Sequence, residues 1–122
     1  MGETVKRVLV VEDEYIIAAD LADALTALGI AVIGPVSSVA KAMAMIDGEQ
    51  LDGAILDINL HGDAVYPVAD ILAARGIPFV FATGYDRTAI EPGYEKFPRC
   101  EKPVEGRRVA QLLFPPASNS GR

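Results

Sequence analysis

Residues 8–14 read Val-Leu-Val-Val-Glu-Asp-Glu, and this stretch decides the fold. Residues 8–11 form an unbroken aliphatic run, without the alternation expected of a strand that has one solvated face. Such a run is typical of a parallel strand that helices cover on both sides. It ends directly in acidic residues, so the stretch predicts a buried central strand with carboxylates at its carboxyl end.

The alternation of a short apolar strand with a helical segment continues along the chain. After residues 8–14, the apolar side chains of Ile17, Leu21, Leu25 and Leu28 have the spacing of one helix face. Repetition of strand and helix predicts a doubly wound α/β fold with a five-stranded parallel sheet. We expect the other strands at 31–34, 53–57, 77–82 and 99–101, and the other helices near 38–48, 65–75 and 104–114.

The connection between the fourth and fifth expected strands differs from the others. Two prolines and a glycine interrupt residues 85–98, so the fourth helix is predicted to be short or irregular. The aromatic side chains of Tyr94 and Phe97, with Tyr85, either cover the gap that a missing helix leaves or form a surface for a partner. The sequence leaves these two alternatives open.

Length and composition limit the class of protein. The 122 residues have a mass of 12.9 kDa, which fits one domain of ordinary size. Hydrophobic residues make up 51 % and charged residues 23 %, and this balance excludes wholesale disorder. We assign residues 1–114 to one domain and expect residues 115–122, rich in Pro, Ser, Asn and Gly, to be a disordered tail.

Charge and cysteine content exclude several functions. Lys and Arg number 11 against 17 Asp and Glu, and the net charge of −6 argues against direct binding to nucleic acid or to an anionic membrane. The longest apolar runs, such as 77–82, are too short to cross a bilayer, and the first residues lack a secretory signal. The single cysteine, Cys100, excludes an internal disulfide and is expected to be a small buried residue. These features predict a cytoplasmic protein.

Polar side chains collect at the carboxyl ends of the expected strands, the edge at which ligands bind in such folds. Glu12 and Asp13 follow the first strand, and Asp57 ends the third. Thr83 follows the fourth strand, and Lys102 follows the fifth. Three carboxylates beside one ammonium leave an excess of negative charge that a divalent cation with a preference for oxygen, Mg²⁺, would offset. This set predicts phosphoryl transfer with Asp57 as the nucleophile.

Over about residues 5–114, the sequence resembles the receiver domain of bacterial two-component response regulators. The resemblance implies a flavodoxin-like receiver fold of five strand–helix units. It also implies a protein that is a phosphoacceptor and not an enzyme with a separate substrate. Four pieces at the expected strand ends carry it, in the family's order: Val-Leu-Val-Val-Glu12-Asp13-Glu14, Ile-Leu-Asp57-Ile-Asn-Leu with Gly62, Phe-Ala-Thr83-Gly, and Glu-Lys102-Pro103.

The resemblance implies a set of metal ligands. The acids at the positions of Asp13 and Asp57 ligate Mg²⁺ directly in the family, and the acid at the position of Glu12 acts through water. The residue two positions after the phosphoacceptor, here Asn59, contributes its backbone carbonyl.

The resemblance also implies roles for the groups that face the phosphoryl group. Asp57 is expected to accept it, the hydroxyl of Thr83 to bond one of its oxygens, and Lys102 to offset its charge. The peptide bond between Lys102 and Pro103 is commonly cis in the family, which aims the lysine inward.

Two local features refine the resemblance. Residues 78–85 read Pro-Phe-Val-Phe-Ala-Thr-Gly-Tyr, similar to a signature of the form Pro-Phe-x-Phe-Ala-Thr-Gly (FATGUY type) in single-domain regulators linked to histidine kinases of the HWE or a related type. Arg99 stands three residues before the lysine, where most receivers carry an aromatic residue that moves inward on phosphorylation. We therefore take Thr83, Tyr85 and Arg99 as the candidate switch residues, with Tyr85 in place of the usual aromatic.

The leading interpretation is a single-domain response regulator in phosphorelay signalling, with a sensor histidine kinase and an unidentified downstream protein as partners. A pseudo-receiver that binds without phosphorylation would need a broken acid site, whereas every acid is present here. A Mg²⁺-dependent phosphatase on a related fold usually has a second acid two residues after the nucleophile, and this position is Asn59. His61 is expected to be a solvated loop residue, because the sequence places no second ligand beside it.

Overall fold

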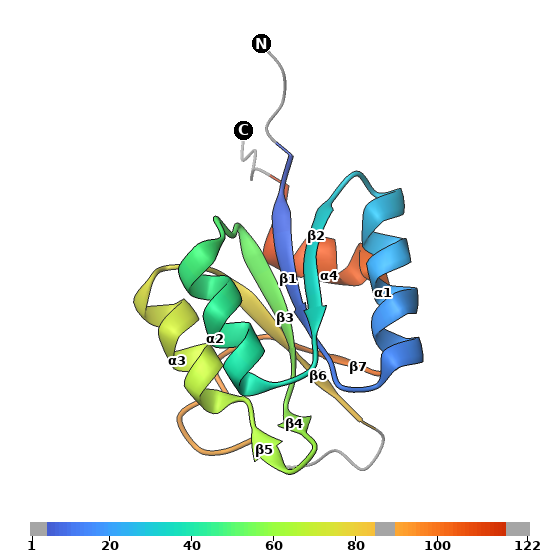
Figure 1. The fold of residues 1–122 in the computed structure, drawn as a ribbon. Helices are drawn as coiled ribbons and strands as arrows, with labels where there is room; N and C mark the ends of the chain where they lie inside the picture. The colour runs from blue at the N-terminus through green and yellow to red at the C-terminus, as the bar shows by residue number, and fades with distance from the viewer. Residues whose placement is uncertain (1–4, 85–89, 117–122) are drawn as a thin grey trace.

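Five parallel strands form one sheet in the order β2-β1-β3-β6-β7 (Figure 1). The computed structural model describes residues 5–84 and 90–116. A short antiparallel hairpin, β4 with β5, follows β3. The strands are β1 (Arg7–Val11), β2 (Ala31–Val36), β3 (Gly53–Asp57), β4 (Asn59–Leu60), β5 (Asp63–Ala64), β6 (Phe79–Thr83) and β7 (Arg99–Glu101), and the helices are α1 (Tyr15–Ala27), α2 (Val39–Gly48), α3 (Tyr66–Ala74) and α4 (Gly106–Leu113).

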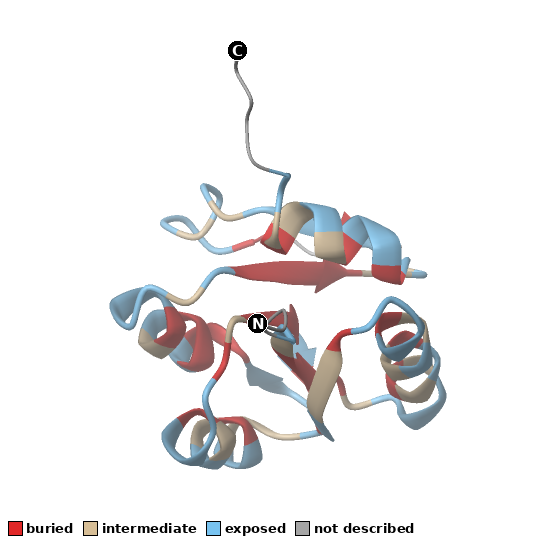
Figure 2. Cartoon of the chain, turned by 90° about the horizontal axis from the view of Figure 1, so that it is seen from above, coloured by how far each residue is buried: buried red, intermediate tan, exposed pale blue. Residues whose placement is uncertain are grey.

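Helices cover both faces of the sheet, as the aliphatic run at 8–11 predicts. Leu9 and Val11 face the core cluster on the side of α2 and α3, whereas Val8 and Val10 face the cluster on the side of α1 and α4. All four side chains are at most 1 % exposed. In Figure 2 the central strands and the inner faces of the helices are buried, and the outer faces of the helices are exposed. The predicted doubly wound α/β fold is confirmed.

The sheet order brings the functional strand ends together. β1 lies between β2 and β3, so the chain changes direction across the sheet at β1. In folds of this kind the crevice at such a switch point, outside the carboxyl ends of the strands, is the ligand site. The residues that follow β1 and those that end β3 therefore meet at one edge.

The second strand is longer than predicted. We expected it to end at Gly34, but β2 continues through Pro35 to Val36. A register irregularity lies between Leu9 and Val11 on the facing strand, and the backbone N–H of Glu12 donates to the carbonyl of Val36 at 2.9 Å. Proline is tolerated here because β2 is an edge strand, where a missing ladder donor costs little.

No helix is present between β6 and β7 among the described residues 90–98, in agreement with the prediction of a short or irregular element. Aromatic rings cover β6 instead. Tyr94 packs on Tyr66 with ring centroids 4.4 Å apart, and Phe97 packs on Phe79 at 4.6 Å. The sequence left open whether these aromatic residues cover the gap of a missing helix or form a surface for a partner. The two half-buried rings cover the gap, which is the first alternative. Tyr85 lies outside the described residues.

None of the described helices has the length and apolar character needed to span a bilayer. The last helix begins at Gly106 rather than 104, and the expected disordered tail falls largely on residues 117–122, which lie outside the described part of the chain.

Candidate functional site

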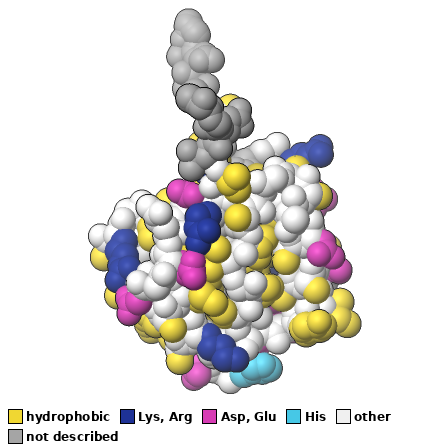
Figure 3. Space-filling model, turned by 45° about the horizontal axis from the view of Figure 1, so that its top comes forward, with side chains coloured by type: hydrophobic (Ala, Val, Ile, Leu, Met, Phe, Trp, Pro, Cys, Tyr) yellow, Lys and Arg dark blue, Asp and Glu magenta, His cyan; other side chains and the backbone are white. Residues whose placement is uncertain are grey.

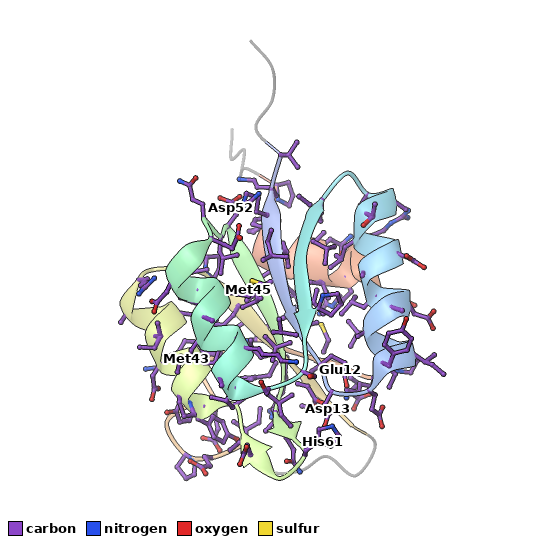
Figure 4. The ribbon with its side chains drawn as sticks, in the orientation of Figure 1. Glu12, Asp13, Met43, Met45, Asp52 and His61 are labelled. Atoms are coloured by element: carbon purple, nitrogen blue, oxygen red, sulfur yellow. The ribbon has the colours of Figure 1, made fainter. Side chains whose placement is uncertain are left out.

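Three carboxylates meet at the carboxyl edge of the sheet. Glu12 and Asp13 directly follow β1, and Asp57 is the last residue of β3. One carboxylate oxygen from each lies within 4.8 Å of the others. Figure 4 shows Glu12 and Asp13 below the end of β1, with Asp52 at the opposite end of the sheet. The register of the two neighbouring parallel strands, with Val11 beside Leu56, places these carboxylates side by side.

Lys102 supplies the positive charge of the cluster. Its Nζ lies 3.1 Å from Oε1 of Glu12 and 3.3 Å from Oδ1 of Asp57. The backbone N–H of Lys102 donates to the carbonyl of Thr83 at 2.8 Å, which continues the pairing of β6 with β7 and carries the side chain to this edge. The peptide bond from Lys102 to Pro103 is cis. Burial lowers the pKa of the Lys102 ammonium, but the carboxylates of Asp57 and Glu12 outweigh it and raise the pKa overall.

The surroundings of Asp57 disfavour the ionised form of its carboxyl. Burial, followed by the negative charge of Glu12, raises the pKa of the Asp57 carboxyl from 3.8 to about 7, although Lys102 acts in the opposite direction. Hydrogen bonding to the side chains of Asp13 and Glu12 adds to the rise. One ammonium is therefore insufficient to balance three crowded carboxylates.

The donor set fits a divalent cation of the Mg²⁺ type. Glu12, Asp13 and Asp57 offer hard oxygen atoms that are close enough to share one ion, and their uncompensated charge favours it. Asn59 lies in β4, two residues beyond Asp57, and its side-chain Oδ1 accepts a hydrogen bond from the backbone N–H of Gly62 at 2.9 Å. The Asn59 side chain is thus engaged within the hairpin.

The candidate switch residues have different surroundings. Thr83 is 7 % exposed, and its hydroxyl donates to the carbonyl of Cys100 at 3.3 Å. Arg99 is exposed at the start of β7, and Tyr85 lies outside the described residues. Cys100 is buried as expected, and burial raises the pKa of its thiol although Arg108 opposes the rise.

Sequence reasoning missed one contact of the cluster. The backbone N–H of His61 donates to Oδ2 of Asp13 at 2.8 Å. The imidazole is 75 % exposed, as expected of a solvated loop residue, and its Nδ1 lies 3.5 Å from the same oxygen. A backbone donor leaves no residue-type signal in the sequence. The available hint was the pair His61–Gly62, a plausible two-residue turn between short strands.

Comparison with solved structures identifies the family. SdrG from Sphingomonas melonis Fr1, in a solution structure, is 41 % identical with a TM-score of 0.81, over 92 % of this chain and 96 % of that chain. A response regulator receiver protein from Sinorhizobium medicae WSM419 is 28 % identical with a TM-score of 0.73, over 89 % and 94 % of the two chains. The chain belongs to the response regulator receiver family.

Another similar structure is the response regulator PhyR from Brucella abortus. This receiver chain is 27 % identical to it with a TM-score of 0.75, over 92 % of this chain and 49 % of that chain. No family model matches the sequence, and no curated protein does. Receivers are signalling proteins rather than conventional enzymes, and the fold and the acidic cluster of this chain agree with such a role.

The raised pKa of Asp57 predicts how stability depends on pH when divalent cations are removed. Because the folded protein holds a proton on Asp57 that the unfolded chain has lost, the free energy of unfolding falls as pH rises from about 4 to about 7. Asp57→Asn removes this dependence, since an amide carries no charge. At pH 8 the variant should be more stable than the wild type by on the order of 2 kcal/mol.

Urea unfolding at several pH values, in the presence of a chelator, measures this difference. The gap between the two proteins should close toward pH 4, where the wild-type carboxyl is protonated. Asp52→Asn, at the far end of the sheet, is the matched control and should run parallel to the wild type. Parallel curves for Asp57→Asn and the wild type would contradict the assigned charge crowding.

Proposed function

We propose that this protein is a single-domain response regulator that accepts a phosphoryl group on Asp57 from a phosphohistidine of a sensor histidine kinase. The reaction is Mg²⁺-dependent, and the product changes the affinity for a downstream protein. One observation carries the proposal: the buried Asp57 carboxylate lies 3.3 Å from Lys102 and shares an oxygen-donor cluster with two further acids. The proposed location is the cytoplasm.

The chemistry requires an ionised Asp57. Its carboxylate oxygen forms a bond to phosphorus while the bond from phosphorus to the histidine nitrogen of the donor breaks, and the leaving imidazole takes up a proton. We assign direct ligation of Mg²⁺ to Asp13 and Asp57, ligation through water to Glu12, and a backbone carbonyl ligand to Asn59. When bound, the ion supplies positive charge that lowers the pKa of Asp57 and offsets charge on the transferring group.

Lys102 and Thr83 complete the proposed site. The Lys102 ammonium already forms an ion pair with the Asp57 carboxylate. After transfer it can form an ion pair with the negatively charged phosphoryl oxygens instead. The Thr83 hydroxyl has a long bond of 3.3 Å to a backbone carbonyl. A phosphoryl oxygen is a stronger acceptor, so we assign Thr83 a move from Cys100 toward Asp57 as the first step of switching.

The later steps of switching are assigned to Tyr85 and Arg99. Arg99 occupies the position where most receivers carry an aromatic residue, and its side chain is already exposed. The proposed switch therefore does not include the inward movement of an aromatic side chain at position 99. SdrG has a structure in a BeF3-activated conformation, 41 % identical to this chain with a TM-score of 0.75, which supports an activated state in this group.

The start of α1 is the proposed docking surface for the kinase. Tyr15 and Ile16 are 85 % and 73 % exposed, unusual for large hydrophobic side chains, and only Glu14 separates them from Asp13 of the acidic cluster. Hydrophobic side chains gather at the lower right of Figure 3, where α1 begins in Figure 1. A cavity of about 470 Å³ beside α1 extends from Ile17 and Leu21 to Lys102. A kinase of the HWE or a related type is the proposed donor, on the basis of the Pro-Phe-x-Phe-Ala-Thr-Gly signature.

Intact mass spectrometry after incubation with Mg²⁺ and acetyl phosphate tests the acceptor chemistry. The wild type should gain a single phosphoryl adduct that disappears when Mg²⁺ is chelated. Asp57→Asn should gain none, because the amide cannot act as the nucleophile, while Asp52→Asn should be labelled like the wild type. An adduct that persists in Asp57→Asn would contradict the assignment, and the absence of any adduct on a Mg²⁺-binding wild type would favour a pseudo-receiver.

A charged substitution on the α1 surface distinguishes docking of the kinase from the phosphoryl transfer itself. In transfer from any autophosphorylated histidine kinase that labels the wild type, Ile16→Glu should slow the reaction by roughly tenfold or more, because a charge replaces an apolar contact. Labelling by acetyl phosphate should be unchanged. Leu28→Glu is the control, since Leu28 is 41 % exposed at the other end of α1, about 20 Å away. Equal slowing by both variants would exclude this docking surface.

A further inference from the structure

A two-residue turn at the tip of the β4–β5 hairpin reaches the acidic cluster. The antiparallel pairing ends at Leu60 and Asp63, which leaves His61 and Gly62 as the turn. Their φ angles are +52° and +92°, and positive values at both central residues are what a type I′ turn requires. In this conformation the backbone N–H of His61 donates to Oδ2 of Asp13 at 2.8 Å.

The hairpin is firmly attached to the rest of the domain. Leu60 is 2 % exposed and Val65 is fully buried, both within the core cluster beside α3. The backbone N–H of Val65 donates to the carbonyl of Ile58 at 2.9 Å and closes the base of the hairpin. At the tip, the N–H of Gly62 donates to Oδ1 of Asn59 at 2.9 Å. The donor that meets Asp13 is therefore held from both ends.

We propose that the backbone N–H of His61 is a positioning group that holds the Asp13 carboxylate in place for the divalent cation, an inference that rests on the proposed function. A fixed donor on one carboxylate oxygen limits rotation of the side chain and keeps Asp13 close to Glu12 and Asp57 before the ion arrives. Hydrogen-bond donors that orient metal ligands typically contribute about 10–100-fold in affinity. The hairpin thus couples the segment after the phosphoacceptor to the cation site.

The imidazole of His61 is not the positioning group. Its ring is 75 % exposed, and the 3.5 Å separation between Nδ1 and Asp13 is long for a hydrogen bond. The single histidine lies at the surface in Figure 3, and Figure 4 shows it beside Asp13 at the lower edge of the fold. Position 61 contributes through its backbone N–H. Residues that accept a positive φ should therefore preserve the contact with Asp13, whereas β-branched residues should disrupt it.

Binding of Mn²⁺, used as a paramagnetic substitute for Mg²⁺ and measured by electron paramagnetic resonance, tests the inference. His61→Val should weaken Mn²⁺ binding by about 10–100-fold, because valine disfavours the positive φ that aims the N–H. His61→Asn and His61→Gly should bind within about twofold of the wild type, since both residues accept this backbone conformation.

Gly76→Val is the matched control for backbone strain. Gly76 has a φ of +72° at the end of α3, and no atom lies within 4 Å of an added Cβ, so valine there creates a similar conflict away from the cluster. Its Mn²⁺ affinity should equal that of the wild type. Wild-type affinity in His61→Val, or an equal loss in His61→Asn, His61→Gly and His61→Val, would overturn the role of the backbone N–H.

Amide hydrogen exchange gives a readout that needs no metal. In the metal-free protein, Asp13→Ala should accelerate exchange of the His61 amide by roughly tenfold, because its acceptor is lost. Exchange at Gly62, whose acceptor is Asn59, should stay unchanged. An unchanged His61 amide would overturn the contact, and with it the inference. Failure of the proposed function is recognised separately, because a wild type without divalent-cation binding or phosphoryl labelling would fail before any variant is compared.

Discussion

The burial of negative charge at the carboxyl edge of the sheet is the constraint on which the rest of the site depends. Glu12, Asp13 and Asp57 are brought within 4.8 Å of one another by the ends of two adjacent parallel strands. Lys102 forms ion pairs with two of them but leaves an excess of negative charge. Burial, together with the charge of Glu12, raises the pKa of Asp57 to about 7. A carboxyl with this pKa changes its protonation with small changes in local charge.

The double covering of the sheet makes this crowding possible. Because helices cover both faces, residues 8–11 of β1 and all residues of β3 are buried, and polar side chains stand at the ends of these strands. The ends of parallel strands lie at one edge, so each strand adds its polar residues to the same place. The β4–β5 hairpin then closes over this edge and brings a backbone donor to Asp13. The arrangement of parallel strands between two layers of helices therefore determines both the buried core and the position of the site.

The sequence was most informative where residue type and strand position agree. The run at 8–11 predicted a strand buried on both faces, and acids at strand ends predicted the cluster at one edge. The extension of β2 through Pro35 was missed, because edge position depends on strand order rather than on local pattern. The contact of His61 with Asp13 was missed because a backbone N–H is the same in every residue except proline. The role of Tyr94 and Phe97 stayed open until their stacking partners were known.

The titration of the Asp57 carboxyl carbon by NMR, with and without Mg²⁺, tests the central claim most directly. The account predicts a pKa of about 7 in the absence of divalent cations, caused by burial and by the charge of Glu12. Saturating Mg²⁺ should move the pKa to well below this value, because the ion favours the charged carboxylate. A pKa near the ordinary value of 3.8 in the metal-free protein, unchanged by Mg²⁺, would contradict the account.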